Sequence, residues 1–172
     1  MNFFFKSKEI LKAFFEKKNI YYLSIVLIIF FFDRYTKLHI INNFSDNRYF
    51  INDYMNFNLI WNTGIGFGLF KSESFLIYNF ISFLIGFIIL ILVFIAVTTN
   101  DYVEKFIYSV IVGGALGNFY DRLILNAVPD FIDLHYNNFH WFIFNVADIF
   151  ITLGIICFII KGFFLNNKNE II

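Results

Sequence analysis

Four long apolar segments alternate with more polar stretches along the chain. They cover residues 20–38, 75–97, 106–125 and 142–164, and the second of them carries no charged residue. A helix needs about 20 predominantly apolar residues to cross the hydrocarbon of a bilayer. The pattern therefore predicts a membrane all-α fold, with a bundle of four transmembrane helices in one integral membrane domain over residues 1–172.

Residues 1–18, which precede the first apolar segment, combine lysines with apolar residues at helical spacing. This pattern predicts either a basic amphipathic helix on the membrane surface or an ordinary solvated tail. In both cases the lysines place the N-terminus in the cytoplasm, and four spans return the C-terminus to the same side. A cleaved secretory signal is the alternative interpretation, but Asp33 and Arg34 follow the apolar run where small residues would mark a cleavage site.

Two segments between the predicted helices have a different pattern. Residues 55–62 nearly alternate between apolar and polar, which favours a strand, and they lead into a glycine-rich turn that includes Gly64. Residues 130–141 are amphipathic and rich in aromatic side chains, which suit the headgroup level of a membrane. We therefore expect a small β-rich extracytoplasmic cap that lies on the outer membrane surface.

Composition supports a membrane protein and excludes several other classes. The 172 residues are 59% hydrophobic and 15% charged, and the mean hydropathy is +0.70, whereas soluble domains are about 45–50% apolar. The formal net charge is zero, so nothing favours nucleic acid as a partner. We expect the chain to contact membrane lipids and to act as a monomer. Its single cysteine, Cys157, excludes an internal disulfide.

Two short polar signatures of the form N-x-x-D interrupt the apolar segments. Asn118 precedes Asp121 in the third segment, and Asn145 precedes Asp148 in the fourth. Residues three apart share one face of a helix, and ionisable residues within spans cost roughly 2.5–3.5 kcal/mol each on insertion scales, which indicates a function. The alternating direction of the spans brings both aspartates, together with Asp33 of the first span, to the outer edge of the hydrocarbon.

This placement suggests a pair of catalytic carboxylates. Two facing carboxylates in a low dielectric share one proton. One of Asp121 and Asp148 can then activate a water while the other donates a proton to a scissile carbonyl. Asn118 and Asn145 would orient the pair or bind the substrate backbone. The residues alone leave two alternatives open, namely buried structural contacts in a non-catalytic protein and a path for ions.

Other polar residues are assigned supporting roles. Asp33 and Lys37 lie four residues apart and form a predicted helical ion pair that braces the site. Arg122 would bind a lipid phosphate or an acidic side chain. Asp130 and Asp133 are interpreted as residues that shape a loop rather than as catalysts.

No cofactor and no metal is expected at the site. The glycines that follow Asn62 lack a βαβ setting and the lysine of a phosphate-binding loop, so they indicate a tight turn or the close approach of a peptide. The histidines are scattered along the sequence, without the H-E-x-x-H pattern of a zinc peptidase. No lysine is placed convincingly beside a serine for a Ser/Lys dyad.

The polar blocks taken together resemble the lipoprotein signal peptidase family, the bacterial aspartic peptidases also called signal peptidase II. Blocks similar to D-R-x-T-K, N-x-G-x-A-F, G-G-A-x-G-N-x-x-D-R, V-x-D-F-x-D and F-N-x-A-D occur in that order at residues 33–37, 62–67, 113–122, 128–133 and 144–148. Gly66 stands where the family usually has alanine.

The resemblance implies a catalytic dyad of Asp121 and Asp148. Supporting or substrate-binding roles are assigned to Asp33, Lys37, Asn62, Gly64, Asn118, Arg122, Asn145 and Ala147. The implied substrate is a bacterial prolipoprotein whose cysteine carries diacylglyceryl, and the cut falls just before that cysteine. The implied location is the bacterial inner membrane, with the active site near its outer face.

Overall fold

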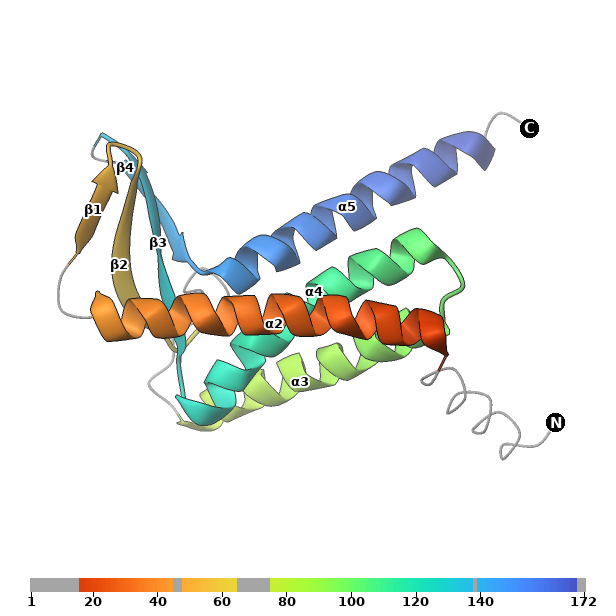
Figure 1. Cartoon of the computed structure of the whole chain (residues 1–172), viewed down its shortest axis with the longest axis horizontal. Helices are drawn as coiled ribbons and strands as arrows, with labels where there is room; N and C mark the ends of the chain where they lie inside the picture. Colours follow the sequence, from red (N-terminus) through yellow and green to blue (C-terminus); the bar gives the residue numbers. More distant parts are fainter. Residues whose placement is uncertain (1–15, 45–47, 65–74, 138, 170–172) are drawn as a thin grey trace.

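The structure is a computed structural model that describes residues 16–44, 48–64, 75–137 and 139–169, with side chains up to residue 163. In these ranges the chain forms long helices with a small sheet at one end (Figure 1). The helices are α2 (Lys17–Asn43), α3 (Phe75–Thr98), α4 (Tyr102–Ile124) and α5 (Val146–Asn169), and the strands are β1 (Tyr49–Asn52), β2 (Met55–Asn62), β3 (Val128–Tyr136) and β4 (Phe139–Phe144). The tail predicted over residues 1–18 lies almost entirely outside the described residues, and so does Gly66.

Helix α4 is the centre of the bundle, because it packs against α2, α3 and α5. Its glycines allow this close packing. A Cβ atom at Gly114 would lie 2.6 Å from the carbonyl oxygen of Ala147 in α5, and one at Gly117 would overlap the carboxylate of Asp33 in α2. Small residues at helix crossings are typical of membrane bundles. The G-G-A-x-G block therefore fixes how closely the helices that carry the polar residues approach one another.

The strands form an antiparallel sheet of order β1-β2-β3-β4 beside one end of the helices (Figure 1). This confirms the prediction of a small β-rich cap next to a helical body. Strand β2 has the bounds that the alternating pattern predicts. Its pairing with β3 sets Asn62 opposite Val128 and Ile60 opposite Asp130. The register therefore brings the end of β2 and the start of β3 to the same end of the bundle.

Apolarity divides the helices into two pairs. Among the described residues, α3 and the stretch Val146–Phe163 of α5 are long and apolar enough to cross a membrane. Helices α2 and α4 do not reach that level, because charged residues lower their hydropathy. Asp33 and Arg34 lie within α2, and α4 has charged residues near both ends, namely Glu104, Lys105, Asp121 and Arg122. Composition therefore gives two clear apolar spans instead of the four that the sequence pattern predicts.

The start of the fourth predicted span also differs from the structure. Residues 142–144, which were expected to be helical, form the end of β4, and α5 begins only at Val146. The aromatic and β-branched side chains of this run suit a strand as well as a helix, so apolarity alone could not separate the two. The polar residue Asn145 marks the actual boundary.

At the opposite end of the bundle, a buried cation closes the α3–α4 turn. The Lys105 ammonium group donates to the carbonyl oxygens of Ala96 and Val97, at 2.7 and 3.0 Å, and to the side-chain oxygen of Asn19 at 2.6 Å. These carbonyls belong to the last turn of α3, where a positive charge is favourable. Lys105 therefore ties the end of α3 to the start of α2.

Candidate active site

Asp148 is held at the N-terminus of α5 by a reciprocal cap. The side-chain oxygen of Asn145 accepts the Asp148 backbone N–H at 3.1 Å, and the Asp148 carboxylate accepts the Asn145 backbone N–H at 3.1 Å. This is the capping-box arrangement, which satisfies two donors that a helix start otherwise leaves unpaired. The other carboxylate oxygen of Asp148 accepts from the Asn118 side chain of α4 at 2.8 Å. The carboxylate is thus fixed from two helices.

Asp130, at the start of β3, is the second carboxylate in this region. It is only 3% exposed, and its two oxygens accept from the side-chain amides of Asn145, at 2.6 Å, and Asn62, at 2.8 Å. Burial, together with the negative charge of Asp148, raises the pKa of Asp130 to about 7. Near neutral pH this side chain can therefore carry a proton.

A cavity of about 280 Å³ lies between these residues. Its polar lining includes the side chains of Asn62, Asn118, Arg122, Asp130 and Asp148. The rest of its wall is mainly apolar and comes from α3, α4, α5 and the start of β3. It adjoins a wider apolar groove of about 470 Å³, which shares several lining residues with it on the same three helices. The two carboxylates therefore face one space that is continuous with an apolar surface.

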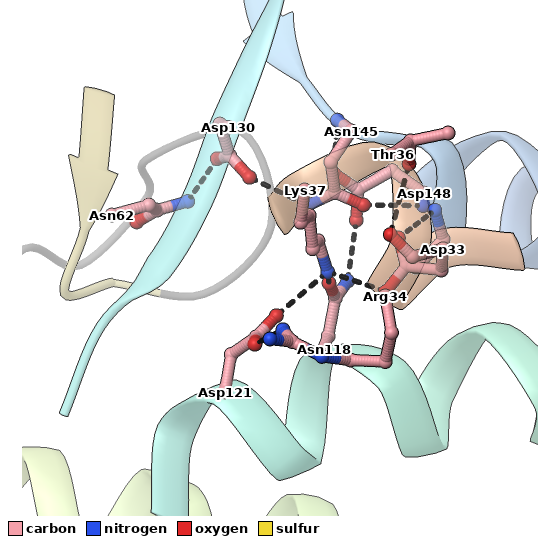
Figure 2. Close-up of polar contacts among 11 residues, drawn as sticks. Asp33, Arg34, Thr36, Lys37, Asn62, Asn118, Asp121, Asp130, Asn145 and Asp148 are labelled. Atoms are coloured by element: carbon pink, nitrogen blue, oxygen red, sulfur yellow. Dashed lines mark hydrogen bonds and ion pairs between the residues drawn. The ribbon is translucent and has the colours of Figure 1, made fainter. Parts of the chain in front are cut away.

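Asp121 lies in a separate group of charges. Its carboxylate pairs with Arg34 and, at 2.8 Å, with the ammonium group of Lys37. Lys37 also lies 2.7 Å from Asp33 and donates to the Asn118 side-chain oxygen at 2.7 Å. Figure 2 shows these side chains converging on Lys37 from α2 and α4. Asp33, Lys37 and Asp121 are all fully buried, so the positive and negative charges must stay together.

Asp33 connects this charge cluster to α5. One of its carboxylate oxygens accepts the backbone N–H of Ala147 at 2.9 Å, while the other pairs with Lys37. The brace predicted between Asp33 and Lys37 is thus present as a direct contact. Ala147 itself is fully buried where α4 and α5 touch.

Arg122 ties the turn after β2 to α4. Its guanidinium donates to the carbonyl oxygen of Gly64, and the Gly64 backbone N–H donates to the Asn62 side chain at 2.8 Å. The guanidinium is buried, and its Nε and Nη1 have no hydrogen-bond acceptor among the described residues. Buried donors without an acceptor, on a residue that lines a cavity, are suited to bind oxygen atoms of a ligand after a small movement of the side chain.

The structure brings most of the predicted residues together but separates the predicted pair. Asp148 lines the cavity with Asp130, whereas Asp121 is not among its lining residues and is neutralised by Arg34 and Lys37. The geometry therefore favours Asp130, which the sequence pattern assigned to loop shaping, as the partner of Asp148. The sequence signal that could have pointed to Asp130 was its position after Pro129 in the V-x-D-F-x-D block.

Comparisons with known proteins agree with a membrane peptidase. Residues 25–164 match the family model described as signal peptidase (SPase) II. A lipoprotein signal peptidase of Pelagibacter ubique (strain HTCC1062) is 50% identical over 156 residues, which cover 88% of this chain and 93% of that protein. One of Francisella tularensis subsp. novicida (strain U112) is 34% identical over 154 residues, which cover 86% and 94%.

Solved structures agree as well. Two structures of a bacterial membrane enzyme superpose with TM-scores of 0.70 and 0.68, at 27% and 28% sequence identity. They cover 87% and 81% of this chain and 90% of each of those chains. The similarity thus extends over the bundle and the sheet together.

Proposed function

Because the chain belongs to the signal peptidase II family, we propose that it cleaves its substrate with Asp130 and Asp148 as the acid–base pair. It is an aspartic endopeptidase of a membrane and removes the signal peptide from prolipoproteins. The proposal includes the position of the cut, just before the cysteine that carries diacylglyceryl.

The main support for Asp130 and Asp148 as the acid–base pair is the cavity that they share. Asp130 and Asp148 come from different elements, line the same space, and are both held by Asn145. A pKa of about 7 for Asp130 lets it exchange a proton at physiological pH. Asp121 lacks this setting, because two cations hold its carboxylate.

The chemistry follows from one shared proton. Asp148, in its ionised form, takes a proton from a water molecule, and that water attacks the scissile carbonyl carbon. Asp130 gives its proton to the carbonyl oxygen, which forms a neutral tetrahedral diol. Asp148 then returns the proton that it took to the leaving nitrogen, and the carbon–nitrogen bond breaks. A proton of the diol passes back to Asp130 as the new carboxyl group forms.

Arg122 is the proposed anchor for the substrate backbone. Arg122 lines the cavity that contains both carboxylates, and its buried Nε and Nη1 have no acceptor among the described residues. Carbonyl oxygens of an extended peptide are suitable acceptors for them, and a charged donor strengthens such a bond. We propose that Asn62 and Gly64 shape this side of the site by holding the turn to which Arg122 is tied.

The charge cluster of Asp33, Lys37 and Asp121 is proposed to position the site without touching the reacting atoms. Lys37 fixes the side-chain oxygen of Asn118, so that the amide nitrogen of Asn118 points at Asp148. Asp33 fixes the first turn of α5 through Ala147. Loss of any of these contacts would move Asp148 relative to Asp130.

We propose that α2 and α4 cross the membrane together with the apolar helices α3 and α5. Their charges are paired inside the bundle, which reduces the penalty for carrying them in a span. In this arrangement both termini are cytoplasmic and the active site lies near the outer face of the inner membrane. The apolar groove beside the site would hold the apolar part of the signal peptide among lipids, and the chain would act as a monomer.

The test compares aspartates that line the cavity with one that does not. We expect Asp130→Asn and Asp148→Asn each to lower kcat for a lipidated signal-peptide substrate by at least 10³-fold, within the range of acid–base contributions. Asp53→Asn is the control, because Asp53 is exposed in the turn between β1 and β2 and does not line the cavity. Purified protein in detergent is assayed, and thermal unfolding confirms that each variant folds.

The same assay also tests the pair predicted from the sequence, Asp121 and Asp148. We expect a folded Asp121→Asn variant to keep measurable cleavage, with a lowered unfolding temperature. Full activity of Asp130→Asn, together with complete loss in a folded Asp121→Asn, would favour Asp121 as the partner of Asp148. Normal cleavage by both Asp130→Asn and Asp148→Asn would favour a non-catalytic role for these acids.

A further inference from the structure

A second group of polar side chains lies on the sheet, apart from the catalytic cavity. It consists of Asp133 and His135 of β3 and His140 of β4, and none of the three lines the cavity. One ligand atom from each residue lies within 4.8 Å of the others. The hairpin creates this group, since the histidines come from different strands.

The strand geometry places all three side chains on one face. Asp133 and His135 are two residues apart in β3, and His135 is directly opposite His140 across the pair of strands. The imidazole rings stack with their centres 5.2 Å apart. The Oδ1 atom of Asp133 and the Nδ1 atom of His140 form a 2.9 Å hydrogen bond, and this distance must open to about 3.3 Å for both atoms to bind one tetrahedral zinc ion.

Outer partners orient two of these side chains. Arg48 holds one carboxylate oxygen of Asp133 at 2.7 Å and leaves the other to face His140. The buried side-chain amide of Asn56 lies 3.3 Å from Nδ1 of His135. Metal-binding carboxylates and imidazoles typically have such supporting hydrogen bonds.

We propose that Asp133, His135 and His140 bind a zinc ion on the surface of the sheet. Two imidazoles and one carboxylate suit Zn²⁺, and three protein ligands leave the fourth position to water. Arg48 also lies 3.2 Å from Nδ1 of His140, and its charge opposes the ion. Because its side chain is 45% exposed, it can leave His140 while it keeps its contact with the outer carboxylate oxygen of Asp133. The bound ion joins β3 to β4 and stabilises the sheet that provides Asp130.

The experiment measures Zn²⁺ binding by calorimetry to the full chain in detergent, after removal of any histidine tag. We expect one ion per chain, and at least a tenfold loss of affinity in both His135→Gln and His140→Gln. His39→Gln is the matched control, because His39 lies on α2 outside the cluster, and it should bind as the unaltered chain does. Retained peptidase activity confirms that each variant folds.

Two further readouts test the same assignment. Co²⁺ in place of Zn²⁺ should give the visible absorption of a tetrahedral site, and Zn²⁺ should raise the unfolding temperature of the unaltered chain but not of the double variant His135→Gln/His140→Gln. Absence of binding by the unaltered chain would overturn the proposal. Equal binding by the double variant would overturn it as well.

Discussion

The side-chain amide of Asn145 donates a 2.6 Å hydrogen bond to Asp130. The same side chain accepts the backbone N–H of Asp148, and its own backbone N–H donates to the Asp148 carboxylate. One asparagine therefore begins α5 and holds two carboxylates at one cavity. A side chain with both a donor and an acceptor is required, and this distinguishes Asn145 from an ordinary helix cap.

Substitutions of Asn145 can separate its role as the cap of α5 from its role as a hydrogen-bond donor to Asp130. Asn145→Asp keeps a good N-cap but removes the donor to Asp130 and adds a negative charge, so we expect kcat to fall at least 100-fold. Asn145→Ala also removes the cap, and should lower the free energy of unfolding by about 1 kcal/mol in addition. Steady-state kinetics and denaturation of both variants check this. A normal kcat in Asn145→Asp would contradict the role of the donor.

The pKa of Asp130 makes stability depend on pH. The pKa is about 7 in the folded chain and about 3.9 in an unfolded one. Between these values the unfolded chain gives up the proton first, so the contribution of Asp130 is fully present below about pH 4 and is lost as pH rises toward 7. We expect the unfolding temperature to fall across this window, and to fall less in Asp130→Asn. Identical pH profiles for the two proteins would argue against a raised pKa.

Lys37 is the central cation of the charge cluster. Replacing it with methionine leaves Asp33 without its ion-pair partner and Asp121 with Arg34 alone. Breaking a buried pair in this way costs about 3–5 kcal/mol of stability. Lys18→Met is the control, because the Lys18 ion pair is exposed and its loss should leave the unfolding midpoint unchanged. Equal midpoints for the two variants would show that the cluster contributes little.

Gly117 sets the distance between α4 and α2. A Cβ atom at this position would overlap the Asp33 carboxylate, whereas one at Gly162 would have nothing within 4 Å. We expect Gly117→Ala to destabilise the chain by about 1–3 kcal/mol and to lower activity, because Asp33 must move away from Ala147. Gly162→Ala should be neutral or slightly stabilising. Parallel unfolding and cleavage assays of the two variants make the comparison.

The sequence predicted the helices, the sheet and most of the polar residues of the site. The blocks around Asp33, Asn118 and Asn145 do meet, because each lies where a helix approaches the same end of the bundle. The two N-x-x-D signatures, however, have different structures. Asn118 and Asp121 are three apart within α4, as predicted, whereas Asn145 and Asp148 form a helix cap.

What the sequence did not contain is the rotation of α4 and the register of β3. Helical spacing places Asp121 on the face of Asn118, but it does not say that Arg34 and Lys37 meet this carboxylate first. Asp130 meets Asn145 at the start of α5 and Asn62 at the end of β2, and the register of the strands, which brings Asn62 near, is set by tertiary contacts. Both properties depend on residues far away in the chain.

Helix α3 packs chiefly on α4, and the groove beside the cavity runs along the α3 side that faces α5. In the proposed arrangement, a substrate that is itself dissolved in the bilayer would reach Asp148 by diffusing sideways within the membrane plane, without passing through an aqueous phase. We expect the rate of cleavage to respond to the viscosity and thickness of the surrounding lipid, as well as to the chemistry of the carboxylates.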